Sequence, residues 1–212
     1  MSAFPVILSA PSGGGKTTIA RRLMERRSDV GYSVSCTTRQ PRDGEVNGRD
    51  YYFISRLDFL RERENHAFAE SAEVHGNLYG TLRREVKRVL SSGKHVLMDI
   101  DVQGAAQFTR AFPDTVTIFV LPPSAEVLLE RLRSRNTETR ETLVARMQSA
   151  LMELQAIQSY EYVIVNDDLE EAVTRVSSII DAEVNSRERV AGLREQVALL
   201  IEKLEHELVN HT

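Results

Sequence analysis

Short apolar runs alternate along most of this chain with segments in which apolar residues recur every three or four positions. The apolar runs are rich in branched side chains and typical of buried strands; they lie at 6–8, 96–98, 116–121 and 162–165. The segments with helical periodicity lie at 19–23, 82–90, 125–133 and 141–157. Strands that alternate with amphipathic helices predict an α/β fold in which helices flank a parallel sheet.

Residues 33–81 interrupt this alternation. Short β-branched or aromatic pieces at 33–35 and 51–54 surround the polar loop 37–50. We interpret this stretch as an inserted small mixed α/β module that binds a substrate. Its loop carries three arginines among turn-forming residues, and a solvated turn without function is the alternative interpretation.

The end of the chain carries an apolar stripe of its own. Steps of three and four residues connect its members, which are Val190, Leu193, Val197, Leu200 and Leu204. The stripe predicts a helix with one apolar face, and it is shorter than the three or four heptads that identify a coiled coil. We expect this helix to pack against the chain's own core, and pairing with another subunit is the alternative.

A glycine-rich loop follows the first apolar run and leads into the first helical segment. Its sequence over 9–18 is Ser-Ala-Pro-Ser-Gly-Gly-Gly-Lys-Thr-Thr. Consecutive glycines let backbone N–H groups turn toward an anion, and a helix N-terminus adds the positive end of its dipole. Lys16 then reaches the β- and γ-phosphates of a nucleotide, while the Thr17 hydroxyl helps to hold Mg²⁺. The strict pattern G-x-x-x-x-G-K-[ST] has glycine where this chain has Ala10.

This loop predicts a sheet of the P-loop NTPase type and a site for ATP. The residues predicted to bind ATP there are Ser12, Gly13, Gly14, Gly15, Lys16, Thr17 and Thr18. Asp99 follows the apolar run 96–98, and a carboxylate at the carboxyl end of a parallel strand acts on Mg²⁺ directly or through water. Thr17 and Asp99 are therefore the predicted metal residues, with a loop-capping role for Asp99 as the alternative.

Composition limits the possible functions. The chain of 212 residues is long enough for one domain with an insertion. Its net charge of −4 argues against broad binding of nucleic acid or anionic membranes. Cys36 is the single cysteine, which excludes an intramolecular disulfide and a cysteine-rich metal site. The N-terminal apolar run is too short for a signal peptide or a membrane span, so we expect a cytoplasmic protein.

Several longer segments resemble the signatures of the guanylate kinase family, in the order in which that family has them. They are 35–42 (Ser-Cys-Thr-Thr-Arg-Gln-Pro-Arg), 44–51 (Gly-Glu-Val-Asn-Gly-Arg-Asp-Tyr), 76–81 (Gly-Asn-Leu-Tyr-Gly-Thr), 99–104 (Asp-Ile-Asp-Val-Gln-Gly) and 165–168 (Val-Asn-Asp-Asp). Together these segments are far more specific than the phosphate loop alone.

The resemblance implies roles for individual residues. The residues that would hold the phosphate of GMP are Arg39, Arg42, Tyr51 and Tyr79. Those that would surround the guanine are Ser35, Glu70, Thr81 and Asp101. The lid and phosphate-binding arginines, which would act in catalysis with Lys16, are Arg131, Arg135 and Arg146. Asn166 would contact the adenine of ATP. Asn136 departs from the glycine that the family usually has in the lid.

The chemistry of the ligands agrees with these roles. Guanidinium groups donate paired, charge-assisted hydrogen bonds to phosphate. Guanine offers an acceptor at O6 and donors at N1 and N2, so carboxylates at Glu70 and Asp101 accept while hydroxyls donate. Adenine presents the wrong pattern for such a site.

The resemblance implies a single guanylate-kinase-like domain over 1–212. Its parts are a core of 4–32 and 82–187, a GMP-binding insert of 33–81, a helical lid of 131–147 and a C-terminal helix of 188–212. The implied reaction of purine nucleotide metabolism transfers the γ-phosphoryl group of ATP to GMP, with Mg²⁺ as the helper ion. Two alternatives are a catalytically inactive interaction module on the same fold and a P-loop kinase for another phosphorylated acceptor.

Overall fold

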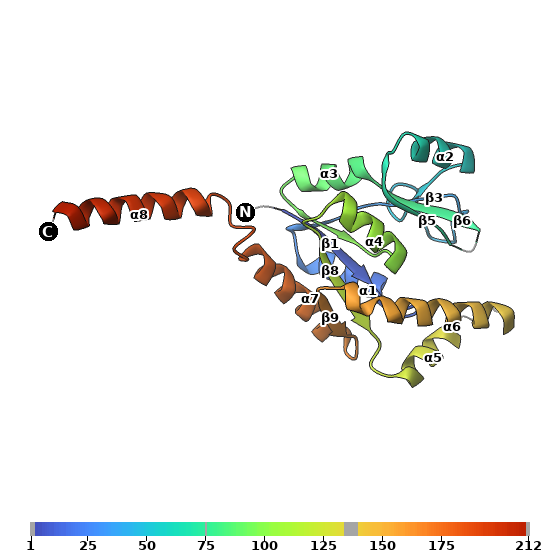
Figure 1. The fold of residues 1–212 in the computed structure, drawn as a ribbon. Coiled ribbons are helices and arrows are strands. Elements are labelled where there is room, and N and C mark those ends of the chain that lie inside the picture. Colours follow the sequence, from blue (N-terminus) through green and yellow to red (C-terminus); the bar gives the residue numbers. More distant parts are fainter. Residues whose placement is uncertain (1–2, 75, 134–139, 211–212) are drawn as a thin grey trace.

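The computed structural model describes residues 3–74, 76–133 and 140–210 (Figure 1). Within these ranges the main sheet has five strands, all parallel. Their spatial order is β2 (Val30–Tyr32), β7 (His95–Met98), β1 (Pro5–Ser9), β8 (Val116–Leu121) and β9 (Tyr162–Val165). The first strand is therefore central, and the chain switches from one side of it to the other. Ligands of such sheets bind at the carboxyl ends of the strands beside this switch.

Helices cover both faces of the main sheet (Figure 1). These helices are α1 (Lys16–Arg26), α3 (Arg83–Ser91), α4 (Val102–Ala111) and α7 (Leu169–Val184). Side chains alternate across a strand, so Val6 and Leu8 join α1 and α7 in one apolar core, while Ile7 joins α3 and α4 in the other. The predicted parallel sheet flanked by helices is confirmed.

A smaller mixed sheet lies in the segment that interrupts the alternation. Its spatial order is β4 (Tyr52–Phe53), β3 (Cys36–Thr37), β6 (Asn77–Leu82) and β5 (Phe68–Val74). Strands β3 and β4 are parallel, and the other neighbours are antiparallel. Helix α2 (Arg56–Glu64) packs Phe59 on Phe68, with ring centroids 4.4 Å apart. The predicted mixed α/β insert is thus present and has its own apolar cluster.

In the described residues between β8 and β9, two helices and a 3₁₀ turn follow one another. They are α5 (Ala125–Arg133), α6 (Arg140–Gln155) and the turn Ala156–Ser159. An apolar cluster of Leu128, Leu132 and Ala150 holds α5 and α6 together, separate from the two cores of the main sheet. The predicted lid segment includes parts of both helices, while Arg135 and Asn136 lie outside the described residues.

Helix α8 (Leu193–Asn210) extends away from the rest of the chain (Figure 1). None of its residues is buried, and Leu200 and Leu204 are 61% and 64% exposed. The expectation that this helix packs against the chain's own core is wrong. The chain turns at Gly192, with φ of 69°, and leads α8 off the end of the domain instead of back onto it.

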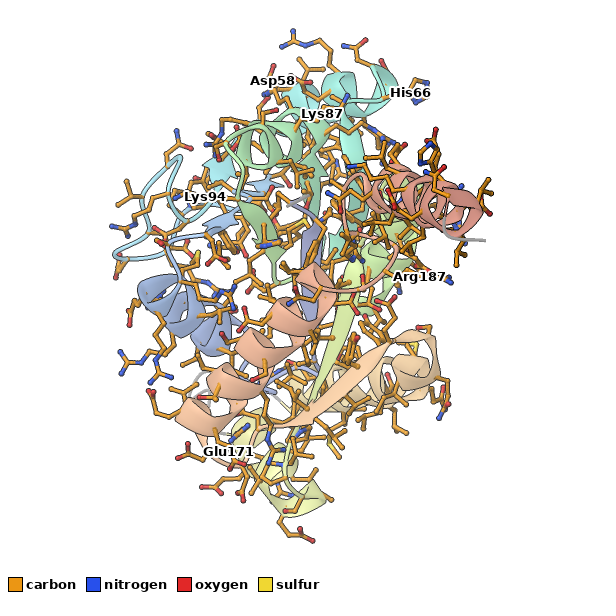
Figure 2. The ribbon with its side chains drawn as sticks, turned by 90° about the vertical axis from the view of Figure 1, so that its left-hand side faces the viewer. Asp58, His66, Lys87, Lys94, Glu171 and Arg187 are labelled. Atoms are coloured by element: carbon orange, nitrogen blue, oxygen red, sulfur yellow. The ribbon has the colours of Figure 1, made fainter. Side chains whose placement is uncertain are left out.

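Charged side chains reach outward from the helices of the domain. Figure 2 shows Asp58 and His66 at one end of the molecule, beside α2, and Glu171 of α7 at the opposite end. In the parts of the chain that the structure describes, no helix combines the length and the apolar character needed to cross a membrane.

Candidate active site

The phosphate loop leads from the central strand β1 into α1. Gly13 and Gly15 have φ of 85° and 91°, in the left-handed region that glycine adopts without a steric penalty. Ala10, which stands where the strict motif has glycine, is buried. A Cβ on Gly14 would lie 2.6 Å from the Cβ of Ala10. Because Gly14 has no side chain, the methyl group of Ala10 fits beside it. The loop therefore accommodates alanine at the position where the strict motif has glycine.

Side chains from distant elements hold this loop in place. Asn166, at the end of β9, is buried and donates from Nδ2 to the carbonyl of Gly14 over 2.9 Å. The Ser12 N–H donates to Oε2 of Glu153, on α6, also over 2.9 Å. Asn166 thus supports the phosphate loop, and its predicted contact with adenine stays a prediction.

The predicted metal residues lie together below the loop. Thr17 Oγ1 donates to Asp99 Oδ2 over 2.5 Å, and the Tyr32 hydroxyl donates to Asp99 Oδ1. Burial and the charge of Asp99 raise the pKa of Tyr32 well above its usual range, so the hydroxyl keeps its proton. Hydroxyl and carboxylate oxygens are the ligands that Mg²⁺ prefers, and few protein ligands suffice when phosphates supply the rest. Thr17 and Asp99 therefore fit a Mg²⁺ site.

The four predicted guanine residues form one cluster. Thr81 Oγ1 donates to Glu70 Oε1 over 2.6 Å and lies 3.3 Å from Ser35 Oγ. Asp101 caps α4, since its Oδ1 accepts from Gly104 N over 2.7 Å. A Cβ on Gly104 would lie 2.9 Å from Glu70 Oε2 and 3.4 Å from Asp101 Oδ1. Glycine at 104 therefore lets the two carboxylates approach the start of α4.

Glu70 titrates far from the usual range of a glutamate. Burial, together with the charge of Asp101, raises its pKa to about 7, although the hydrogen bond from the Thr81 hydroxyl acts in the opposite direction. The side chain is only 6% exposed. Its carboxylate is consequently poised to gain or lose a proton near neutral pH.

The residues predicted to hold the GMP phosphate line the same cleft as the phosphate loop. Glu45 accepts from Arg39 Nη1 and Nη2 over 2.9 and 2.8 Å, and from Arg42 N over 2.7 Å. The Arg39 guanidinium stands over the Tyr51 ring, 5.5 Å from its centroid. The Tyr51 and Tyr79 rings meet edge-on, with centroids 6.0 Å apart. Burial raises the pKa of Tyr51 to about 12, which keeps its hydroxyl a donor.

The described lid arginines approach the phosphate loop from α5 and α6. Arg146 is buried and donates to the Leu132 carbonyl over 2.6 Å and to Ser12 Oγ over 3.4 Å. A Cβ on Gly13 would lie 3.2 Å from the Cβ of Arg131, so α5 also lies against the loop.

One cleft of about 1220 Å³ brings most of the predicted site together. The predicted residues that line it are Ser12, Lys16, Thr17, Ser35, Arg39, Arg42, Tyr51, Glu70, Tyr79, Asp99, Asp101 and Arg146. Thr81 is fully buried behind Glu70, and Thr18 is exposed on α1. The phosphate loop and the carboxylates of Glu70 and Asp101 therefore open onto the same space.

Among the residues of the cleft without a role predicted from the sequence, three make hydrogen bonds to predicted site residues: Tyr32, Glu45 and Glu153. Tyr32 and Glu153 come from an edge strand and from α6, and no motif or spacing in the chain marks them. Glu45 lies inside the resembling segment 44–51, which was a usable signal. Its pairing with Arg39 depends on the folding of the polar loop and is invisible in the sequence.

A phosphate loop that follows the central strand and shares one cleft with an acidic cluster is the arrangement of a P-loop nucleotide kinase. The chain belongs to the guanylate kinase family, whose profile matches residues 2–183. It is 44% identical over 204 residues to the guanylate kinase of Bartonella henselae, across 95% of this chain and 91% of that protein. Identity to the guanylate kinase of Caldanaerobacter subterraneus is 44% over 178 residues, across 84% and 86%.

A solved structure is similar in fold as well. The crystal structure of guanylate kinase from Anaplasma phagocytophilum is 39% identical in sequence and has a TM-score of 0.76. The similarity covers 92% of this chain and 93% of that one.

Proposed function

We propose that this chain catalyses the guanylate kinase reaction, the transfer of the γ-phosphoryl group of ATP to GMP, giving ADP and GDP. The observation that carries the proposal is that one cleft of about 1220 Å³ is lined by Lys16 and Thr17 together with Glu70 and Asp101. A phosphate-binding loop and a guanine-accepting carboxylate pair in one cleft are what this reaction requires.

Recognition of GMP rests on two groups of residues in the insert and at the start of α4. Glu70 and Asp101 accept from the N1 and N2 donors of guanine, since carboxylates are acceptors. Ser35 and Thr81 supply hydroxyls beside them. The phosphate is held by Arg39, Arg42, Tyr51 and Tyr79, whose guanidinium and hydroxyl groups donate to its oxygens.

Phosphoryl transfer needs positioning and charge stabilisation, and the phosphate oxygen of GMP is the nucleophile. Lys16 stabilises the charge that develops on the transferring group, together with Arg131, Arg135 and Arg146 from the lid. The cleft between α6 and the insert excludes water from the reaction when both substrates are bound.

Thr17 and Asp99 would hold Mg²⁺ together with the phosphates of ATP. When bound, the ion neutralises charge on the β- and γ-phosphates. Tyr32 and Thr17 each donate to Asp99, so they fix the direction of its two oxygens. Asn166 orients the loop beside which ATP binds.

An assay of ADP release with a panel of acceptors tests this function. We expect release with GMP and far slower release with AMP, CMP or UMP. Lys16→Ala serves as the negative control. Its turnover should fall on the order of 10³-fold, as it does when a donor to the transition state is lost. Activity with another acceptor alone would indicate a different kinase. A folded chain that releases no ADP with any acceptor would indicate an interaction module.

The setting of the enzyme follows from the same chemistry. Its substrates place it in purine nucleotide metabolism, and its net charge of −4 fits a cytoplasmic enzyme that binds nucleotides through local clusters. Neither nucleic acid nor membrane is a proposed partner. A second copy of the chain is a proposed partner, because the apolar stripe of α8 is exposed in the single chain.

A further inference from the structure

The two lid helices pack on each other rather than on the main sheet. Their shared cluster of Leu128, Leu132 and Ala150 is separate from both sheet cores. The position of this helix pair relative to the phosphate loop must therefore depend on other contacts. Two hydrogen bonds between α6 and the phosphate loop are made to the same loop residue, Ser12.

Ser12 meets α6 through its backbone and its side chain. Its N–H donates to Glu153 Oε2 over 2.9 Å, and its Oγ accepts from Arg146 Nη2 over 3.4 Å. Arg146 and Glu153 are seven residues apart and share one face of the helix. This face of α6 therefore holds a single loop residue at two points.

The Glu153 carboxylate lies in the nucleotide cleft. Burial raises its pKa, while the Ser12 N–H and the positive charge of Lys16 favour the ionised form and Asp101 opposes it. The carboxylate therefore lies within electrostatic reach of both Lys16 and Asp101. Glu153 is not among the residues proposed to bind GMP or ATP.

We propose that Glu153 is a positioning residue that couples the lid helix α6 to the phosphate loop through the Ser12 N–H. The inference rests on the proposed function, because the coupled parts are those that hold ATP. The hydrogen bond fixes the loop, and with it Lys16, relative to Arg146 on the same helix face. Losing the bond frees the loop to move, and a displacement of about 1 Å at a reacting group costs on the order of 10²-fold in rate.

Substitutions at position 153 distinguish the effect of the hydrogen-bond acceptor from the effect of the negative charge. Glu153→Gln keeps the length and an acceptor oxygen but removes the charge. Glu153→Asp keeps the charge but shortens the side chain, so its oxygens fall short of Ser12. Glu153→Ala removes both. Gln148→Ala, at an exposed position of the same helix, is the matched control for a truncated side chain on α6.

Steady-state kinetics with both substrates give the first measurement. We expect kcat within about threefold of wild type for Glu153→Gln and Gln148→Ala. For Glu153→Asp and Glu153→Ala we expect kcat to fall by about tenfold to a hundredfold. The KM for GMP should stay within about twofold throughout, because the residues proposed to hold the GMP phosphate belong to the insert and not to α6 or the phosphate loop. A Gln variant as impaired as the Asp variant, or an active Asp variant beside an impaired Gln variant, overturns the proposal.

Hydrogen exchange of the ligand-free protein gives a second measurement that does not depend on catalysis. Amide exchange in a peptide over 9–18 should be faster in Glu153→Asp and Glu153→Ala than in wild type, and unchanged in Glu153→Gln. If exchange in this peptide is the same in all variants, Glu153 does not position the loop. That result would leave the assignment of the guanylate kinase reaction untouched.

Discussion

At the scale of single residues, Arg39 shows what residue type predicts and what it does not. Its motif predicted a phosphate ligand, but Nη1 and Nη2 of its guanidinium both donate to the Glu45 carboxylate, and Nη1 donates also to the Gln40 carbonyl. Glu45 thereby sets the direction in which the remaining N–H groups point. A phosphate meets a guanidinium whose orientation is fixed beforehand, which reduces the entropy lost on binding.

Base selectivity is expected to depend on Glu70 and Asp101. A site built on hydrogen bonds to its substrate discriminates by about 10⁴-fold, and losing one buried partner costs roughly 1 to 3 kcal/mol. Glu70→Gln and Asp101→Asn should each reduce the preference of kcat/KM for GMP over AMP by about tenfold to a hundredfold. Glu64→Gln, on exposed α2, is the control. Equal use of AMP and GMP by the wild type would contradict this account.

The raised pKa of Glu70 predicts a pH dependence of GMP binding. Protonation near pH 7 removes an acceptor for guanine, so the KM for GMP should rise as the pH falls from 8 to 6. The phosphate of GMP also titrates near pH 6, and Glu70→Gln separates the two effects because it keeps only the phosphate titration. Identical pH profiles for the two proteins would show that Glu70 does not titrate in this range.

The same group links pH to folding. A carboxyl whose pKa is raised to about 7 by burial in the folded protein binds more protons there than in the unfolded chain. Its contribution to the free energy of unfolding is complete below the ordinary glutamate pKa and is lost as the pH rises through about 7. The Glu70→Gln variant should lack this decline when unfolding is measured by denaturant at several pH values.

At the scale of elements, the strands and helices predicted from the sequence are those with a strong periodicity of apolar residues. The apolar runs became β1, β7, β8 and β9, and the amphipathic segments became α3, α5 and α6. The edge strand β2 was not predicted, because it is three residues long and contains Gly31. Helix α4 was not predicted either, and Gly104 weakens its helical signal. That glycine is needed where Glu70 approaches, which the sequence alone does not show.

The site follows the same rule. Residues within motifs, such as Thr17 and Asp99, came together as predicted. Tyr32 and Glu153 reach the cleft from segments whose relative placement only the folded sheet determines. Helix α7 was not singled out, although its buried Ala172, Val176 and Ile180 recur every four residues.

The phosphate loop is expected to tolerate no Cβ at position 14. A Cβ there would lie 2.6 Å from the Cβ of Ala10 and 2.9 Å from the Pro11 carbonyl, and neither neighbour is a flexible side-chain end. Gly14→Ala should lower the free energy of unfolding by about 1 to 3 kcal/mol and reduce kcat strongly. Ala10→Gly combined with Gly14→Ala should recover part of both losses. If the double variant is no better than Gly14→Ala, the fit between these two positions is not the cause.

At the scale of the whole molecule, the sequence of α8 predicts that this exposed helix pairs with the same helix of a second copy. Two copies that pair antiparallel about the midpoint between residues 200 and 201 bring apolar positions opposite apolar ones. These pairs are Leu193 with Leu208, Val197 with Leu204, and Leu200 with Ile201. The same pairing sets Arg194 opposite Glu207 of the other helix, whereas a parallel pairing would set like charges side by side.

Removal of α8 is therefore expected to change the mass of the protein in solution without changing the fold. The cut belongs after Gly192, because Arg189 bonds Glu183 and the Asp114 carbonyl and stands 4.3 Å from the Phe4 ring centroid. We expect the full chain to approach twice 23.9 kDa in light scattering as its concentration rises, and a chain without 193–212 to remain a monomer. The melting temperature and kcat should be unchanged, since α8 buries no residue within the single chain.

Charge exchange tests the antiparallel register itself. Arg194→Glu should weaken the pairing, because the new carboxylate faces Glu207 of the other helix. Adding Glu207→Arg should restore the pairing. Each such ion pair contributes a few tenths of a kcal/mol at an exposed helix face, so the shift in the dimer dissociation constant should be a fewfold and should shrink at high salt. A full chain that stays monomeric at all concentrations, or a double variant no better than Arg194→Glu, would rule this pairing out.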